Sequence, residues 1–280
     1  MKRRRFIKRG IIGTTGLAFL QGMYTWQVEP FWLDFVNVKM PIRHLPKKLH
    51  GKTLMQISDI HIDKKATNDF VIKSFKKAQK LKPDFVVYTG DFVNEGTAQQ
   101  LINLKNVMQH RVRGKKGTVA ILGNHDYGHN WNQKTIANQI SNVLRRKDIK
   151  VLRNQQISLH GLNIIGFDDL WGPSFNPNAV MRKYYEKKAN IILCHNPDVC
   201  DLNVWNNYKG WILSGHTHGG QCKPPFLKPP LLPVKNKKYT AGQFNLGDGR
   251  TLYINRALGH TLQVRFNVKP EITIFELQCA

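Results

Sequence analysis

Eight side chains of the kinds that bind divalent cations or transfer protons follow short apolar segments along the chain. They are Asp59, His61, Asp91, Asn124, His125, His195, His216 and His218. Carboxylate, amide and imidazole donors without a thiolate suit manganese, iron or zinc, and of these we expect manganese. In the pairs Asp59/His61 and His216/His218, one residue separates the two side chains, so at a strand end both point to the same side. The pattern predicts a site for divalent metal ions.

Each of these residues follows an apolar run that we interpret as a buried strand. The runs cover residues 54–58, 85–89, 119–122, 191–194 and 211–214. Between the first two runs, apolar side chains recur at helical spacing from Val71 to Leu81, and Pro83 ends that helix. This strand-helix-strand unit implies a parallel pair. Because sites in open α/β sheets form beyond the carboxyl ends of strands, we expect the five following loops to converge.

Further strand candidates lie in the second half of the chain, at residues 162–167, 251–255, 263–268 and 272–277. The last three are spaced closely enough for hairpins, so the sheet should mix parallel and antiparallel pairs. The residues alone predict an α/β protein with a mixed sheet. Two such sheets packed face to face, with helices outside, would form a four-layer sandwich.

The ordered motifs resemble the signature of the calcineurin-like metallophosphoesterases. They are Asp59-x-His61, Gly90-Asp91, Gly123-Asn124-His125-Asp126, His195 and Gly215-His216-Thr217-His218, within roughly residues 50–277. The resemblance implies a four-layer α/β/β/α metallophosphoesterase fold with two metal ions bridged by Asp91. In the implied ligand sets, one ion is held by Asp59, His61, Asp91 and His218, and the other by Asp91, Asn124, His195 and His216.

The same resemblance implies a role for His125, and the sequence offers further polar residues near the ligands. His125 would stabilise a phosphoryl oxygen or protonate the leaving group. Asp126 would orient His125 or cap the following turn. Asp168 and Asp169 could support the ligands, but we favour solvated turn formers. Two positions depart from the family pattern, Ala257 where glycine is common and Asn94 where an acid is common, and we expect neither to touch the ligands.

The charge of the chain predicts an anionic partner. Its 280 residues carry a formal net charge of +25, of which residues 1–50 contribute +8 and the remainder +17. Such a balance suits lipid headgroups, nucleotides or nucleic acid. A basic nucleic-acid- or membrane-binding module without catalysis would leave the ligand set unexplained, so we expect no nucleic-acid partner. The four cysteines have neither the spacing nor the density of a disulfide scaffold.

The chain divides into residues 1–27, a signal or membrane anchor, residues 28–49, a linker and edge strand, and residues 50–280, the phosphoesterase domain. The run from Arg3 to Lys8 resembles a twin-arginine export signal, and an uncharged, mildly apolar stretch follows it. An anchor of this kind keeps its arginines in the cytoplasm and exports the body from the inner membrane. The alternative is an interfacial basic helix that holds the body on the cytoplasmic face.

Residues 222–238, which we call the proline loop, bear on the substrate. They contain five prolines and five lysines, with Phe226, Leu227, Leu231 and Leu232 between them. Such a loop suits an anionic membrane surface, or else is a rigid surface connection. Together with the N-terminus and His195-Asn196-Pro197-Asp198, it resembles the membrane-anchored bacterial branch of the family. We therefore expect hydrolysis of a phosphodiester or pyrophosphate in a lipid-linked or nucleotide-sugar substrate, or alternatively UDP-2,3-diacylglucosamine pyrophosphatase activity in lipid A synthesis.

Overall fold

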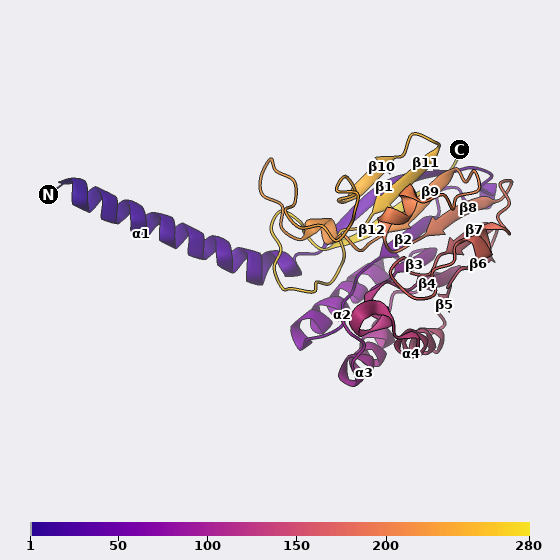
Figure 1. The fold of residues 1–280 in the computed structure, drawn as a ribbon, viewed down its shortest axis with the longest axis horizontal. Helices are drawn as coiled ribbons and strands as arrows, with labels where there is room; N and C mark the ends of the chain where they lie inside the picture. The colour runs from indigo at the N-terminus through magenta and orange to yellow at the C-terminus, as the bar shows by residue number, and fades with distance from the viewer. Residues whose placement is uncertain (1) are drawn as a thin grey trace.

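Two sheets of six strands form the body of the protein in this computed structural model, which describes residues 2–280 (Figure 1). The first sheet has the order β1 (Asp34–Ile42), β12 (Glu271–Cys279), β2 (Thr53–Ile57), β3 (Phe85–Thr89), β4 (Gly117–Ile121) and β5 (Lys150–Val151). Its pairs are parallel except β12 with β2.

The second sheet has the order β10 (Gly242–Asn245), β11 (Arg250–Ile254), β9 (Gly210–Ser214), β8 (Ala189–Leu193), β7 (Leu162–Gly166) and β6 (Gln155–Leu159). Its two outermost pairs are antiparallel and the inner three are parallel. The prediction of an α/β protein with mixed sheets is confirmed.

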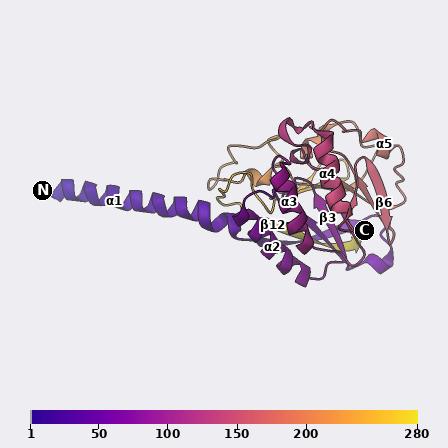
Figure 2. The ribbon, with the colours of Figure 1, turned by 90° about the horizontal axis from the view of Figure 1, so that it is seen from below.

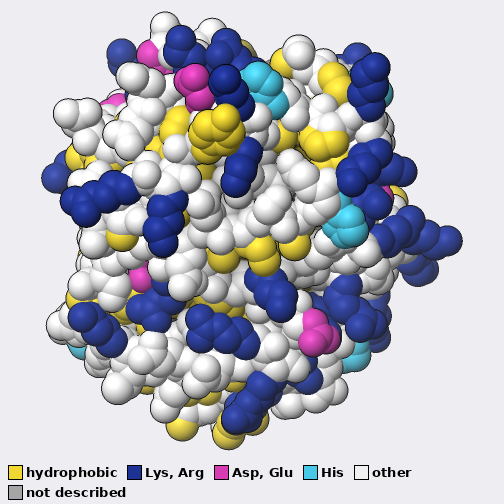
Figure 3. All heavy atoms as spheres, turned by 90° about the vertical axis from the view of Figure 1, so that its right-hand side faces the viewer, with side chains coloured by type: hydrophobic (Ala, Val, Ile, Leu, Met, Phe, Trp, Pro, Cys, Tyr) yellow, Lys and Arg dark blue, Asp and Glu magenta, His cyan; other side chains and the backbone are white. Residues whose placement is uncertain are grey.

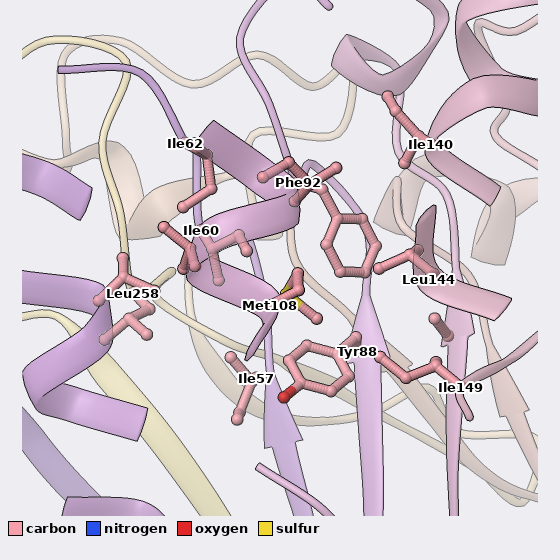
Figure 4. Packing of buried hydrophobic residues seen from close by; sticks show 14 of the residues in the cluster. Ile57, Ile60, Ile62, Tyr88, Phe92, Met108, Ile140, Leu144, Ile149 and Leu258 are labelled. Atoms are coloured by element: carbon pink, nitrogen blue, oxygen red, sulfur yellow. The ribbon is translucent and has the colours of Figure 1, made fainter. Parts of the chain in front are cut away.

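The sheets pack face to face through one apolar cluster, to which Phe85 and Val119 contribute from the first sheet and Leu193 and Leu213 from the second. The outer face of the first sheet is covered by α2 (Lys65–Lys80), α3 (Ala98–Val107) and α4 (Lys134–Arg145), as Figure 2 shows. Figure 4 shows the apolar side chains packed between this sheet and its helices, with Tyr88 among them.

The outer face of the second sheet carries a thinner layer. It consists of the four-residue helix α5 (Asn178–Met181), a 3-10 turn at Pro197–Asp201 and loops, which enclose Phe167 and Trp205. The four-layer arrangement is therefore present, with one outer layer built mainly from loops. The other short helical turns are Tyr24–Val28, Glu29–Phe31, Lys47–Leu49, Met108–His110, His125–Tyr127, His129–Trp131 and His218–Gly220.

The helix expected after the first strand illustrates why these elements form. Val71, Phe75 and Ala78 lie on one face of α2 and are buried, while its basic side chains face solvent. The helix ends at Lys80, ahead of Pro83, as the sequence predicts.

The expected strand at residues 263–268 is wrong. Apart from one isolated bridge between Cys222 and Phe266, this segment is a loop. Arg265 is buried in it, and its guanidinium donates hydrogen bonds to the carbonyls of Arg256, Gly259 and Val268 at 2.7–3.0 Å. The expected hairpins among the last strands are also wrong, because β11 and β12 belong to different sheets.

Helix α1 (Lys2–Met23) projects away from the body in Figures 1 and 2. The turn that follows it, Tyr24–Val28, meets the body where the backbone N–H of Arg265 donates to the carbonyl of Thr25, and the Gln263 amide to that of Trp26. Met1 of the expected signal segment lies outside the described residues. Within residues 2–280, no helix combines the length and apolar content that crossing a membrane requires.

Candidate metal centre

All eight residues singled out from the sequence lie at the carboxyl ends of five strands. Asp59 and His61 follow β2, Asp91 follows β3, and Asn124 with His125 follows β4; in the second sheet His195 follows β8, and His216 with His218 follows β9. Because both sheets place these strand ends at the same edge, residues up to 159 positions apart meet there. The structure brings the whole predicted set together.

The side chains of Asp59, His61 and His218 form one buried group, whose ligand atoms all lie within 4.8 Å of one another. His218 Nε2 lies 3.2 Å from Asp59 Oδ1 and 3.0 Å from His61 Nε2. Three donors around one point are the arrangement that a metal ion requires.

A second buried group of the same kind contains Asp91, His195 and His216. His195 Nε2 lies 3.1 Å from Asp91 Oδ2. The two groups adjoin, since His61 Nε2 lies 3.7 Å from Asp91 Oδ2 and His195 Nε2 lies 3.9 Å from Asp59 Oδ1. They divide the histidines as the family resemblance implies, with Asp91 between the two groups.

Asn124 adds an independent indication of a metal site. Its side chain is 1% exposed, and neither its amide nitrogen nor its oxygen has a hydrogen-bond partner among the described residues. Burying an unpaired amide is costly. A metal ion bound by the amide oxygen removes much of that cost, so the residues present fit a two-metal centre.

Each ligand histidine uses one ring nitrogen to donate a hydrogen bond away from the centre. The acceptors are Asn94 Oδ1 for His61 (2.7 Å), Thr89 O for His195 (2.7 Å), Pro233 O for His216 (2.7 Å) and Gln221 Oε1 for His218 (2.9 Å). Because these oxygens can only accept, the donating nitrogen carries the proton and the other nitrogen keeps a free lone pair. Such bonds fix the tautomer and orientation of metal-binding histidines.

The electrostatics of the centre favour neutral His61 and His216 and ionised Asp59. Burial lowers the pKa of His216 to about 3 and that of His61 well below its usual value. Burial alone raises the pKa of Asp59, but the nearby His195 and His218 bring it down to about 2. Neutral imidazoles and ionised carboxylates are the forms that bind metal ions. His195 differs, because the carboxylates of Asp91 and Asp59 outweigh its burial and raise its pKa well above the usual value.

The backbone at the centre is held in an unusual conformation. Five of the ligand residues have positive φ angles, between 44° and 69°: Asp59, His61, Asp91, His216 and His218. Such angles cost free energy for non-glycine residues and cluster at functional sites. The motif glycines are required by close approach, since a Cβ at Gly123 would collide with the Asp91 carboxylate and one at Gly215 with Ser58 and Asp59.

His125 borders the centre without belonging to either ligand group. Its backbone N–H donates to Asp91 Oδ1 at 3.0 Å and its Nδ1 donates to the Asn94 carbonyl at 2.6 Å, which leaves Nε2 available. Asp126 has neither of its expected contacts. Its two oxygens accept from the backbone N–H groups of Phe92 and Gly123 and thereby join the loops after β3 and β4.

Three further expectations about neighbouring residues need correction. Asn94 does touch the ligand set, through His61. Asp168 and Asp169 are buried rather than solvated. Asp168 pairs with Arg153 at 3.0 Å, and burial raises the pKa of Asp169 to about 7.

An aromatic pair beside the centre was not predicted from the sequence. Trp131 and Trp171 stack with ring centroids 4.7 Å apart beside His125 and His216. Trp131 could have been suspected from the sequence, because it lies only six positions after His125. Gln221 could likewise have been found three positions after His218, whereas Thr89 and Pro233 act through carbonyls that any residue supplies.

Comparisons with known proteins agree with this geometry. Residues 52–220 match the family described as calcineurin-like phosphoesterase. The chain is 30% identical to the UDP-2,3-diacylglucosamine pyrophosphatase LpxG of Chlamydia muridarum, over 82% of this chain and 85% of that protein. It is 28% identical to LpxG of Chlamydia trachomatis, over 96% and 98%, and 25% identical to the phosphodiesterase YaeI of Escherichia coli, over 99% of each.

Proposed function

The chain belongs to the calcineurin-like phosphoesterases, and we propose that it hydrolyses a phosphodiester or pyrophosphate bond in a lipid-linked or nucleotide-sugar substrate at a membrane surface. Its family and relatives make it a metal-dependent phosphohydrolase. The observation that carries the proposal is the pair of adjoining histidine-carboxylate groups, with the unpaired amide of Asn124 beside them.

Two divalent ions would occupy the two groups, with manganese preferred and iron or zinc as alternatives. The proposed ligands are Asp59, His61, Asp91 and His218 for one ion and Asp91, Asn124, His195 and His216 for the other. When bound, such a pair supplies a hydroxide near neutral pH and neutralises the phosphoryl oxygens. The chain contributes the carboxylate of Asp91 and the lone pairs of the histidines, whose rings are held in place by hydrogen bonds. These ligands do not have to change orientation when an ion binds.

His125 is the proposed catalytic residue. The hydrogen bonds to Asp91 Oδ1 and to the Asn94 carbonyl fix its backbone and its ring. Nε2 is the ring atom left to contact a phosphoryl oxygen or to protonate the leaving group. Protonation of Nε2 leaves the bond from Nδ1 to the Asn94 carbonyl intact, because that bond has the ring as donor in both states.

The proline loop supports the membrane part of the proposal. Phe226, Leu227 and Leu231 are exposed in it, with Lys223 and Lys228 beside them. Exposed apolar side chains among lysines suit an anionic lipid surface, where the former enter the interface and the latter meet phosphates. The loop lies on the side of the body from which α1 leaves (Figure 1).

The proline loop also contacts the metal centre directly. The carbonyl of Pro233 accepts the hydrogen bond of His216, and Gln221, which precedes the loop, accepts that of His218. A membrane bound at this loop would therefore hold a lipid-linked phosphate close to the catalytic residues.

The basic charge of the body is less informative about location. Lysine and arginine side chains are also spread over the face opposite α1 (Figure 3), so they are not confined to the proposed membrane side. We propose an inner-membrane-associated protein with an exported body, on the strength of the twin-arginine-like run near the start of α1. A cytoplasm-facing peripheral protein is the alternative.

The second candidate function is hydrolysis of UDP-2,3-diacylglucosamine, which requires the cytoplasm-facing location. Two relatives that carry this activity in their names, at 28% and 30% identity, favour it. A nucleic-acid-binding module without catalysis is not favoured, because it gives no reason for a buried, unpaired Asn124 among histidines.

The test is an assay of the full chain, loaded with Mn²⁺ in detergent micelles, against bis(4-nitrophenyl) phosphate and UDP-2,3-diacylglucosamine. Turnover of the diester that chelation abolishes supports the phosphodiesterase, and release of UMP selects the second candidate. An absence of turnover with manganese, iron and zinc overturns the proposal. Protease accessibility in spheroplasts decides the location, since an exported body is digested and a cytoplasmic one is protected.

A further inference from the structure

Trp131 and Trp171 form a stacked aromatic pair beside the metal centre. Their rings stack with centroids 4.7 Å apart and an interplanar angle of 22°. Trp171 meets the metal-ligand candidate His216 edge-on at 4.5 Å, and Trp131 lies 6.3 Å from His125. The pair therefore extends from a ligand of one ion to the proposed catalytic residue.

The backbone presents Trp131 at considerable conformational cost. Asn130 and Trp131 both have positive φ angles, 57° and 56°, directly after Gly128 and His129. Left-handed geometry is rare for a bulky residue and indicates a functional constraint where it occurs beside a site. The indole is nevertheless 37% exposed, so this geometry does not serve to bury it in a core.

A cavity of 350 Å³ adjoins this indole and His125. Its other lining residues are Asn94, Glu95, Gly128, His129 and Asn130. A planar ring with polar edges can stack on the indole and form hydrogen bonds with the side chains of Glu95 and Asn130.

We propose that Trp131, supported by Trp171, is a stacking subsite for the nucleobase of a nucleotide-containing substrate. This inference rests on the proposed function and specifies which part of the substrate the protein recognises outside the phosphate. Aromatic side chains stack on any base, because every base has a π face. Polar neighbours such as Glu95 and Asn130 then select among base edges.

The experiment measures binding of UMP, AMP, inorganic phosphate and decyl phosphate to the metal-loaded full chain by calorimetry. Trp131→Ala should raise the Kd of UMP or AMP by about tenfold, as expected for loss of one stacking contact, and leave the Kd of phosphate unchanged. Trp131→Phe should restore most of the affinity. Trp32→Ala removes another half-exposed tryptophan, which contacts Lys269, and should have no effect.

Three results would overturn the inference. In the first, nucleotides bind the wild-type protein no more tightly than phosphate does. In the second, Trp131→Ala leaves the affinity for nucleotides unchanged, and in the third it lowers the affinity for phosphate as much as that for nucleotides. If the binding of decyl phosphate depends on Trp131 and the binding of nucleotides does not, the subsite belongs to an acyl chain instead. If the wild-type protein hydrolyses no ester at all, the proposed function is wrong. If the enzyme is active but binds nucleotides no more tightly than phosphate, only the proposed subsite is wrong.

Discussion

His61 Nε2 and His218 Nε2 lie 3.0 Å apart, although 157 positions separate the two residues in the chain. The Nδ1–H group of each ring donates a hydrogen bond outward, to Asn94 Oδ1 from His61 and to Gln221 Oε1 from His218, so both Nε2 atoms present lone pairs to the same point. Two lone pairs at this distance repel each other unless a cation lies between or beside them. The chain therefore holds a position for a positive charge before any ion binds.

Asn94 should control the affinity of this position for metal. Asn94→Ala removes the acceptor that orients His61, and the loss of such a partner weakens metal binding by about 10–100-fold. The carbonyl that binds His125 remains, so kcat at saturating Mn²⁺ should change much less. Titration of activity with Mn²⁺ measures both quantities. Asn94→Asp should bind at least as tightly as wild type, and an unchanged activation curve for Asn94→Ala would remove this role.

His125→Ala should lower kcat by about 10²–10⁴-fold without loss of bound metal. If His125 protonates the leaving group, an alkyl diester should suffer more than bis(4-nitrophenyl) phosphate, because nitrophenolate leaves without a proton. Equal losses for both substrates would indicate stabilisation of the phosphoryl oxygen. Steady-state kinetics with metal analysis of each preparation distinguish these results, and wild-type rates on both substrates would exclude either role.

The proline loop should contribute to lipid binding. Phe226→Ser combined with Leu231→Ser should lower binding to phosphatidylglycerol vesicles by about tenfold, since the burial of apolar side chains is lost. Cosedimentation measures the bound fraction, and hydrolysis of a soluble diester should stay unchanged. Ile102→Ser provides a control, because Ile102 is an exposed apolar residue on α3. Equal vesicle binding by the loop variant and this control would contradict the proposed surface.

Ala257 has a φ of 69°, in the turn where the family commonly has glycine. Left-handed geometry costs an alanine about 1–2 kcal/mol, and the greater freedom of an unfolded glycine returns about 0.5–1 kcal/mol of that. The methyl group of Ala257 is buried and its removal costs about 0.8 kcal/mol, so Ala257→Gly should leave the free energy of unfolding within about 1 kcal/mol of wild type in chemical denaturation. Ala137→Gly, within α4, also loses a buried methyl group and should destabilise the protein by about 2 kcal/mol, because helix propensity is lost as well. A comparable loss in both variants would show that the turn is not strained.

The core of the fold was predictable where apolar runs meet polar loops. The five ligand-bearing strands were found because each is buried and stops at a residue of distinctive chemistry. The strand predicted around Arg265 was wrong because this segment does not pair with a neighbouring strand. It positions the buried guanidinium of Arg265, which donates hydrogen bonds to backbone carbonyls. Helices α3 and α4 were not identified, although Ile140 and Leu144 in α4 have helical spacing and are buried.

The candidate site shows a similar division. Ligand side chains are identified by residue type, so Asp91 and His195 could be named from the sequence. Their supporting contacts depend on three-dimensional proximity: the Thr89 carbonyl that orients His195 carries no chemical signature. Asn94 was visible only as a departure from the family pattern, and the structure gives the reason that this position matters.

Metal content is the most direct test of the central claim that Asp91 joins two ion sites. The full chain is loaded with Mn²⁺, freed of unbound metal and analysed by mass spectrometry alongside Asp91→Asn, with circular dichroism to verify folding. We expect two ions per wild-type chain, and the loss of at least one ion and of diester hydrolysis in the folded variant. A single ion in the active wild-type enzyme, or full metal content and turnover in Asp91→Asn, would contradict it.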